Sequence, residues 1–498
     1  MNRVVLITGL VLASAAAGVV ATGSVISGLP VALALAVAGF LALVPVAFGR
    51  WIALTALLLG WLMLEDLFRK LAGNDVRLYF VKDAIFALVL ISMVSDNGLR
   101  GKWRAATGSS RLWLYALIGW GVTRSFPPSS DFRTPLIGLR LDFLYVPLVI
   151  AGYAIASDRE RLKRWWRGIA VLGAATGLVG VIQASIGPGF LAPSRDAPGL
   201  PFLNLVRGLP GQAEVFRPSG TFVDPGRFLA AMIVCLAIGL AAVIVRRRDR
   251  RATAAVAVMA AAVWVSGGRT GMLVATGLIC VAAVAPSWAA RRTSFVGIVR
   301  IVAIAAVALV TLPVVAPDLY TSRLAWYRDT LDPRSGRNEW SFLWTNYSSD
   351  TVRGIGIGGP VGNGTGTESL GRQYVYGGSE RSTTGLNKVE GGWAAIAVEW
   401  GWVGLFLWVG WTISWLGRLR RCVRAARPSP FAAGGAVLLA IVFFDLVVGF
   451  FGGLQGFQNY IENAYFWLIS GMILGLPALA SGRASDAEGV GEALAVVE

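Results

Sequence analysis

Two arginines lie in short glycine-containing segments, each of which leads into an apolar stretch. Arg217 begins the sequence Arg-Pro-Ser-Gly-Thr-Phe-Val-Asp-Pro-Gly-Arg, and Arg269 lies in Ser-Gly-Gly-Arg-Thr-Gly. The planar guanidinium group suits phosphate oxygens, and a helix that begins nearby adds backbone N–H groups and a favourable dipole. These two segments therefore predict binding of an anionic partner. The alternative is that each arginine pairs with a local carboxylate or extends to lipid headgroups.

Other charged side chains are predicted at the same ends of the apolar stretches. They are Arg140, Asp142, Asp224, Arg227, Lys388 and Glu390. Inserting an arginine at membrane depth costs about 2.5–3.5 kcal/mol of free energy on insertion scales, so a group of such residues indicates a functional role. The sequence contains no histidine, and any proton transfer must use a carboxylate, tyrosine, lysine or cysteine. The three cysteines show no metal-ligand spacing, and we expect no metal or cofactor.

The elements that would position these residues are membrane helices. Hydrophobic residues make up 55% of the 498 positions and charged residues 15%, which excludes a water-soluble protein. Apolar stretches of about 18 residues recur, each long enough to cross a membrane as a helix, and short alternating strands are absent. We predict an all-α polytopic membrane protein of about fourteen transmembrane helices. They lie near residues 4–21, 30–47, 51–66, 78–96, 112–123, 136–156, 168–186, 222–245, 253–267, 271–287, 295–315, 391–415, 431–453 and 460–480.

Arginines are concentrated in alternate connections between these helices. The short connections at 159–167, 246–251 and 418–427 are rich in arginine, whereas those on the other side carry few basic residues. The positive-inside rule then predicts that both termini are cytoplasmic and that the glycine-containing segments face outward. The net charge of +17 follows from this topology and requires no nucleic acid. The first 23 residues could pass for a signal peptide; we favour a retained helix, and cleavage would leave later orientations unchanged.

The predicted helices leave two long outer loops. The chain divides into N-terminal transmembrane helices (1–186), a first outer loop (187–221), central transmembrane helices (222–315), a large outer loop with short helices (316–390), C-terminal transmembrane helices (391–480) and a disordered cytoplasmic tail (481–498).

Within the large outer loop, Tyr320 to Leu331 and Arg337 to Tyr347 have helical spacing. The segment from Gly354 to Gly366 is rich in glycine, but no Lys-Ser/Thr follows it, so a phosphate-binding loop is disfavoured. We expect a flexible lid or a turn there. The aromatic residues of this loop could stack on sugar rings or anchor the loop at the membrane interface.

The order of the motifs resembles the bacterial O-antigen ligase and polymerase superfamily. Arg217-Pro-Ser-Gly-Thr-Phe and Ser266-Gly-Gly-Arg-Thr-Gly-Met-Leu carry this resemblance in the central helices. Ser335-Gly-Arg-Asn-Glu-Trp, Gly354-Ile-Gly-Ile-Gly and the closing segment Glu390-Gly-Gly-Trp-Ala-Ala-Ile-Ala-Val-Glu-Trp-Gly-Trp-Val-Gly carry it in and after the large outer loop. Each motif is short, and the resemblance as a whole covers roughly residues 136–415.

The resemblance implies a metal-independent glycosyltransferase of GT-C type in the bacterial plasma (inner) membrane, with its active site on the outer face. Such enzymes transfer a glycan from a polyprenyl-pyrophosphate carrier to the hydroxyl of a glycan, lipid or protein acceptor. Arg217 and Arg269 match the arginines that stabilise the pyrophosphate leaving group. Further contacts to phosphate or sugar are expected from Arg140, Arg227, Arg337, Arg353 and Lys388.

The proposed base departs from the family pattern. Ligases of this family commonly have a histidine nine residues before the acidic position that matches Glu399, and here Glu390 stands in its place. A carboxylate can still accept a proton from an acceptor hydroxyl, particularly when it is partly desolvated. Polymerase-like members often carry an acid there, which favours a polysaccharide polymerase over a ligase. The alternative is that Glu390 only interacts with the dipole of the following helix.

Two other classes of protein remain open at this stage. A transporter or flippase of lipid-linked glycans would also have many helices and outer cations, although we find no internal repeat. It would also need charges at mid-membrane, where Asp445 is the clear candidate. A protonated Asp445 bonded to a neighbouring helix would look the same in sequence. An assembly partner without catalytic function is the third possibility.

Overall fold

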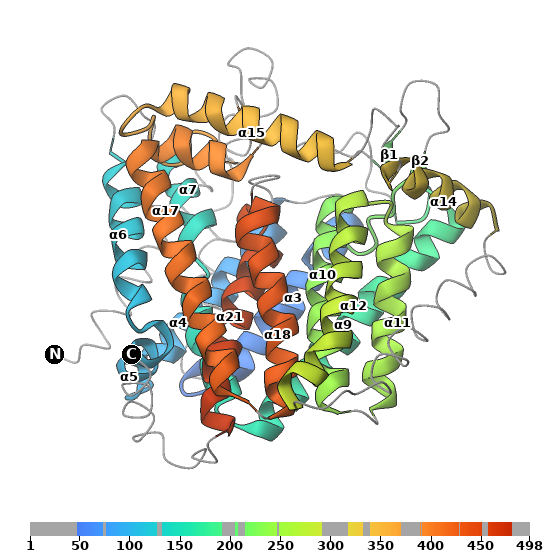
Figure 1. Ribbon diagram of the computed structural model, residues 1–498, viewed down its shortest axis with the longest axis horizontal. Helices are drawn as coiled ribbons and strands as arrows, with labels where there is room; N and C mark the ends of the chain where they lie inside the picture. The colour runs from blue at the N-terminus through green and yellow to red at the C-terminus, as the bar shows by residue number, and fades with distance from the viewer. Residues whose placement is uncertain are drawn as a thin grey trace.

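The protein is a bundle of long helices with two further helices lying across one end (Figure 1). The computed structural model describes residues 47–72, 76–126, 132–191, 205–207, 215–246, 249–290, 317–331, 339–369, 389, 391–427, 429–450 and 457–480. The crossing helices are α14 (Pro317–Leu331) and α15 (Glu339–Gly358). A two-stranded antiparallel pair, β1 (Val206–Arg207) and β2 (Val215–Phe216), lies beside α14. We call this the capped end of the bundle.

The bundle itself consists of thirteen α-helices in the part of the chain that the structure describes. They are α3 (Trp51–Leu71), α4 (Val81–Val94), α5 (Leu99–Thr107), α6 (Ser110–Thr123), α7 (Arg133–Phe143), α8 (Leu148–Ala156), α9 (Arg159–Ile186), α10 (Pro225–Val245), α11 (Arg250–Val265), α12 (Arg269–Ala290), α17 (Gly392–Ala425), α18 (Pro430–Phe443) and α21 (Tyr460–Ala480). A short 3₁₀ helix, η1 (Val76–Phe80), precedes α4, and a π-helical turn, η4 (Phe444–Gly449), follows α18.

Eight helices of the described chain are long and apolar enough to cross a membrane. The bent pair Leu78–Val94 and Leu99–Thr107 would make a ninth if it forms one span. These helices confirm the prediction of an all-α, multi-pass membrane protein. The helices predicted near 4–21 and 295–315 lie outside the described residues, as does all but the end of the one near 30–47. The total of about fourteen therefore stays a prediction.

Local predictions differ from the structure where charged stretches were expected to be connections: residues 159–167 begin α9, and residues 418–425 end α17. Residues 99–107 were expected to form a connection because they are charged, yet they form α5, in which Ala106 is fully buried. The helix expected over 136–156 is confirmed as one span, Arg133–Ala156, within which a turn at residues 144–147 separates α7 from α8. Pro147, in this turn, lacks the N–H group that a regular α-helix would use.

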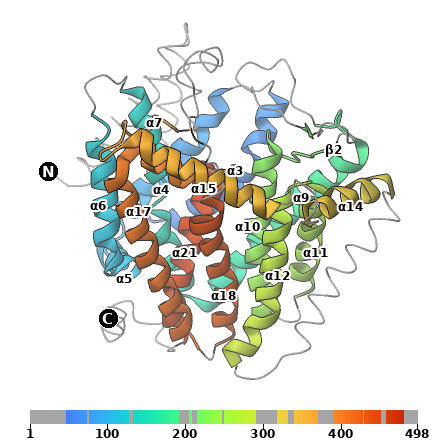
Figure 2. The same ribbon diagram turned by 45° about the horizontal axis from the view of Figure 1, so that its top comes forward.

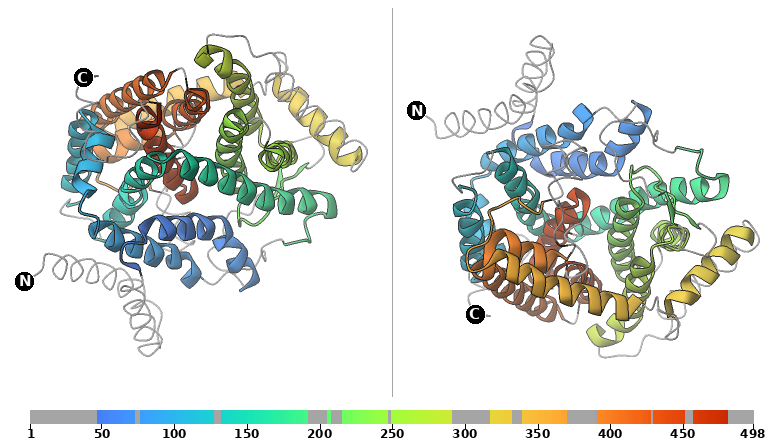
Figure 3. Two further views of the ribbon diagram at one scale, coloured as in Figure 1. Left: turned by 90° about the horizontal axis from the view of Figure 1, so that it is seen from below. Right: turned by 90° about the horizontal axis from the view of Figure 1, so that it is seen from above.

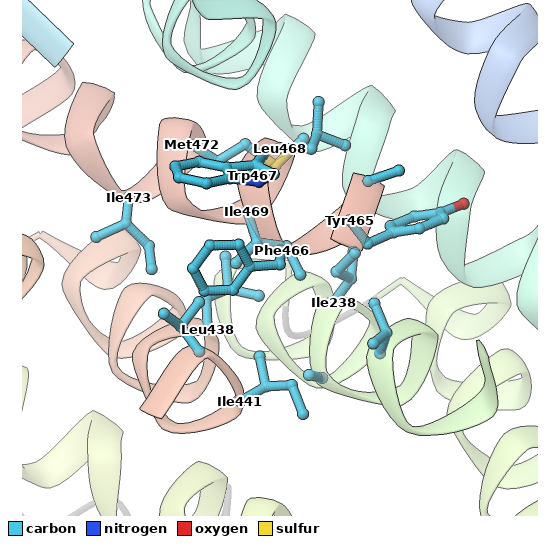
Figure 4. Close-up of a cluster of buried hydrophobic side chains, with 14 of the residues drawn as sticks. Ile238, Leu438, Ile441, Tyr465, Phe466, Trp467, Leu468, Ile469, Met472 and Ile473 are labelled. Atoms are coloured by element: carbon cyan, nitrogen blue, oxygen red, sulfur yellow. The ribbon is translucent and has the colours of Figure 1, made fainter. Parts of the chain in front are cut away.

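Helix α21 (red) lies near the middle of the bundle when it is viewed along its axis (Figure 3). Its side chains pack between α18 and α10, where Phe466 and Ile469 face Leu438 and Ile238 (Figure 4). On its other side, Gly471 approaches α8 so closely that a Cβ atom there would lie 2.1 Å from the Val149 carbonyl oxygen. Small residues allow such backbone approach in membrane helices, where packing supplies much of the stability.

The capping helix α15 lies across the ends of α17 and α21 (Figure 2). Glycines set its contact with α17: a Cβ atom on Gly354 would lie 2.6 Å from the Ala394 carbonyl oxygen, and one on Gly358 would lie 1.8 Å from that of Ala397. The expectation of a lid or turn from Gly354 is therefore wrong as far as Gly358, because these residues form the last turns of α15. It is right for residues 359–369, which form a turn segment.

This contact gives a prediction about stability. Gly358→Ala should lower the free energy of unfolding by about 1–3 kcal/mol, because the new methyl group would force α15 away from α17. Gly356→Ala is the matched control, since a Cβ atom there meets nothing within 4 Å. Alanine at that helical position should stabilise the protein by about 0.5–1 kcal/mol. Thermal unfolding of the purified protein in detergent measures both, and equal midpoints for the two variants would contradict the packing described here.

Candidate active site

Arg269 is the first residue of a long helix at the capped end. The turn before it, Ser266–Gly268, joins α11 to α12, and Gly267 adopts a positive φ of 68° that favours glycine. The Ser266 hydroxyl donates to the Val263 carbonyl oxygen (2.6 Å) and accepts from the Gly268 N–H group (3.2 Å). Arg269 thus lies at the amino end of a 22-residue helix, a position at which anions are favoured.

Arg217 follows β2 and begins a segment that side chains from two helices hold in place. The Gln183 side-chain oxygen of α9 accepts hydrogen bonds from the N–H groups of Ser219 (2.9 Å) and Gly220 (2.7 Å). The Lys70 ammonium group of α3 donates to the Ser219 hydroxyl (3.0 Å) and to the Gly220 carbonyl oxygen (2.8 Å). These hydrogen bonds from α9 and α3 hold the segment in place, and so they fix the position of Arg217 at its start.

A third arginine, Arg323 of α14, meets Arg217 at the α11–α12 turn. Its Nη2 donates to the Phe216 carbonyl oxygen, directly before Arg217. A Cβ atom on Gly267 would lie 2.5 Å from Arg323 Nη1 and 3.5 Å from Arg217 Cγ, so both side chains pack against this glycine. Only a residue without a side chain fits between them.

The same helix places an aromatic ring against Arg269. Trp326 donates from its indole Nε1 to the Gly267 carbonyl oxygen (3.1 Å), and its ring centroid lies 4.1 Å from the Arg269 guanidinium carbon. Tyr327 donates its hydroxyl to the Trp264 carbonyl oxygen (2.8 Å). These contacts dock α14 on the turn, so that Arg217, Arg269 and Arg323 surround Gly267. We call these three residues the arginine cluster.

The electrostatic environment of the cluster is unfavourable to cations. Arg323 is fully buried, and no carboxylate of the described chain lies within ion-pair distance of it. Burial, with a smaller contribution from the neighbouring Arg217, lowers the pKa of Arg323 to about 10, although Tyr327 opposes the shift. Arg323 therefore remains positively charged at neutral pH, and the cluster concentrates positive charge at the amino end of α12.

Two other arginines that the sequence predicts to bind phosphate form ion pairs with carboxylates in the structure. Arg227 Nη1 lies 3.1 Å from a carboxylate oxygen of Asp66, a buried residue of α3. Arg140 Nη2 lies 2.6 Å from a carboxylate oxygen of Asp83 on α4. Because Asp66 is buried, loss of Arg227 would leave an uncompensated charge, which gives Arg227 a structural role. The Arg140–Asp83 pair is partly exposed and connects α7 to α4. A role toward phosphate stays a prediction for each.

The Arg227–Asp66 pair belongs to a larger network of charges on α3 and α4. Asp66 also binds Arg69 (3.0 Å) and the backbone N–H group of Val223 (3.3 Å). Lys82 binds Glu65 (2.8 Å), and its Nζ lies 3.1 Å from the ring centroid of Tyr79. Since Asp66 holds both Val223 and Arg227, the network fixes the far end of the segment that starts at Arg217.

Glu399 of α17 supports the backbone of the turn after α15. Its two carboxylate oxygens accept hydrogen bonds from the N–H groups of Gly366 (3.0 Å) and Glu368 (2.8 Å), and the residue is only 2% exposed. Next to it in α17, Gly401 has a positive φ of 68° and marks a kink. Glu399 therefore positions the turn segment that follows α15.

The remaining predicted site residues are placed only in part. Glu390, Lys388 and Arg337 lie outside the described residues. The flanking Val389 is buried, and the N–H group of Gly391 donates to an Asp350 carboxylate oxygen of α15 (2.8 Å).

Two further candidates are described. Arg353 is exposed on α15. Asp445 lies buried in the π-helical turn η4.

Sequence reasoning missed Arg323. The helical spacing of residues 320–331 was evident, but nothing in the sequence distinguishes this arginine from the others of the large outer loop. Its significance comes from the docking of α14 on a turn more than 50 residues earlier in the chain.

Comparisons with known proteins do not assign this chain to a family. No protein-family model matches this chain, and no curated protein sequence matches it. The function of this protein must therefore be inferred from the residues of the arginine cluster and the elements that hold them.

Proposed function

We propose that this protein is a glycosyltransferase of the outer face of a bacterial plasma membrane. It would take a glycan from a polyprenyl-pyrophosphate carrier and transfer it to an acceptor hydroxyl, as a polymerase or ligase of a cell-surface polysaccharide. The observation that carries the proposal is the convergence of Arg217, Arg269 and Arg323 at one turn beside the amino end of α12. Such a concentration of guanidinium groups suits a diphosphate.

The orientation of the bundle supports an outer site. Helix α10 begins next to the Arg217 segment at the capped end and finishes at Val245 at the other end (Figure 1). The connection from α10 to α11, with Arg246 and Arg250, therefore lies at the end opposite the arginine cluster. Under the positive-inside rule this arginine-rich end is cytoplasmic, and the capped end faces outward.

The proposed reaction is a single displacement at the anomeric carbon. The acceptor oxygen forms a bond to that carbon while the bond from the carbon to the phosphate oxygen breaks. Glu390 accepts the proton of the acceptor hydroxyl, and the polyprenyl diphosphate leaves with the electron pair. The arginine cluster stabilises the negative charge that develops on the leaving oxygen, which is electrostatic catalysis. Displacement in one step inverts the configuration of the sugar carbon.

A flippase of lipid-linked glycans is the second candidate, and the buried charge network around Asp66 and Lys82 is the observation that favours it. Charged residues within membrane helices often line transport pathways. In this chain, however, the network also binds the Arg217 segment and thereby has a structural explanation.

Reconstitution distinguishes the two functions. The purified protein in liposomes, given a polyprenyl-pyrophosphate-linked oligosaccharide, should produce a longer or transferred glycan and release free polyprenyl diphosphate. Movement of the donor across the bilayer without any new glycosidic bond would support the flippase and reject the transferase.

A further inference from the structure

Arg323 is a buried cation with unused hydrogen-bonding capacity. The side chain is fully buried, and of its three nitrogens only Nη2 has a partner in the described chain, the Phe216 carbonyl oxygen. Nε and Nη1 are buried and donate to no atom of the described residues. Buried donors without partners are rare in folded proteins, and such a group calls for a ligand or another specific explanation.

The surroundings of Arg323 make its burial unfavourable unless an anion is present. Arg217 is the neighbouring charge, and it repels Arg323 instead of compensating it. Arg323 Nη1 packs directly against Gly267, and Arg269 stands two residues further on, at the amino end of α12. The unused donors, the neighbouring arginines and the helix dipole all favour a negatively charged group at the same turn.

We propose that Arg323 is a direct ligand of the diphosphate and that α14 completes the anion-binding site by docking on the α11–α12 turn. The identity of the ligand as a diphosphate rests on the proposed function, whereas the presence of an anion site rests on the geometry alone. Trp326, which binds the backbone of this turn, and Tyr327, which binds the end of α11, hold α14 in the docked position. Arg323 then contributes N–H donors that Arg217 and Arg269 cannot supply.

The competing explanation is that Arg323 only ties α14 to β2 through the Phe216 carbonyl oxygen. The two explanations predict opposite effects on stability. A purely structural Arg323 would stabilise the protein in the absence of any ligand. If Arg323 instead serves to bind an anion, its buried charge is uncompensated in the ligand-free protein and lowers stability. A neutral residue at this position would then leave the stability of the free protein unchanged or raise it.

Binding of inorganic pyrophosphate to the purified full-length protein tests the inference. Arg323→Gln should weaken binding about tenfold or more, as expected for the loss of charge-assisted hydrogen bonds. It should also abolish the rise in thermal midpoint that pyrophosphate causes, without lowering the midpoint of the free protein. Arg328→Gln removes the same charge from an exposed position of the same helix and should change neither quantity. Arg323→Gln with unchanged pyrophosphate affinity and a lower midpoint would overturn the proposal.

A second variant keeps the test decisive if Arg323→Gln does not fold. Arg323→Lys retains the positive charge but has three N–H donors in place of five, so its pyrophosphate affinity should lie below that of the wild type. Equal affinity in Arg323→Lys and the wild type would reject direct ligation by the guanidinium group.

The binding assay separates this inference from the proposed function. Pyrophosphate binding that depends on Arg323, in a protein that forms no glycosidic bond, would uphold the site and reject the transferase. Glycan transfer by Arg323→Gln with wild-type KM and kcat would reject the role of Arg323 and uphold the transferase.

Discussion

Replacing Arg217 or Arg269 with glutamine is expected to lower the rate of glycan transfer by about 10²–10³-fold, the usual effect of removing one group that stabilises a developing negative charge. Both side chains lie at the α11–α12 turn, and both would interact more strongly with the leaving diphosphate than with the intact donor. The loss should therefore appear mainly in kcat. The measurement is the initial rate of product formation in proteoliposomes with a polyprenyl-pyrophosphate-linked oligosaccharide.

The controls for these variants are the amount of inserted protein and the exposed Arg328. Arg328→Gln should transfer glycan at the wild-type rate, since this residue lies on α14 but is exposed, whereas Arg323 is buried. If Arg217→Gln and Arg269→Gln retained full turnover at equal protein levels, neither residue could stabilise the leaving group.

Replacing Glu390 with glutamine is the second change with a large expected effect. Loss of a positioned general base typically lowers the rate by about 10²–10⁴-fold. Glutamine keeps the size of the side chain and removes its ability to accept the proton of the acceptor hydroxyl. Pyrophosphate affinity should be unchanged, because the anion site lies with the arginines. The rate of transfer and the pyrophosphate binding curve, measured on the same preparation, check both expectations.

Glu160→Gln is the matched control for Glu390→Gln. Glu160 is an exposed carboxylate in the first turn of α9, in the arginine-rich stretch that the sequence predicts to be cytoplasmic. It should leave transfer unchanged. Full turnover by Glu390→Gln would reject this residue as the base, and the arginine cluster would then need another proton acceptor near it.

Much of the helical framework could be predicted from hydropathy alone. A chain in lipid must satisfy its backbone hydrogen bonds internally, so long apolar stretches become helices regardless of tertiary contacts. The prediction failed where tertiary packing decides the structure. Helix α5 carries Arg100, Lys102 and Arg104 and gives no apolar stretch, and the glycines up to Gly358 serve close helix packing instead of a turn.

The candidate site could be predicted only in part, for a related reason. Topology alone placed Arg217 and Arg269 on the same side of the membrane, and the structure places both at one turn. No local pattern could show that Arg227 binds Asp66, 161 positions earlier in the chain, or that Arg140 binds Asp83. Arg323 could not be predicted because its burial depends on tertiary contacts between α14 and the α11–α12 turn, which no local sequence pattern shows.

A cryo-electron microscopy structure with a bound polyprenyl diphosphate tests the central claim most directly. The account predicts diphosphate density within hydrogen-bonding distance of Arg217, Arg269 and Arg323, beside the amino end of α12. Density for the diphosphate elsewhere, for example at Arg246 and Arg250 on the opposite end of the bundle, with the three arginines bound only to protein atoms, would contradict it.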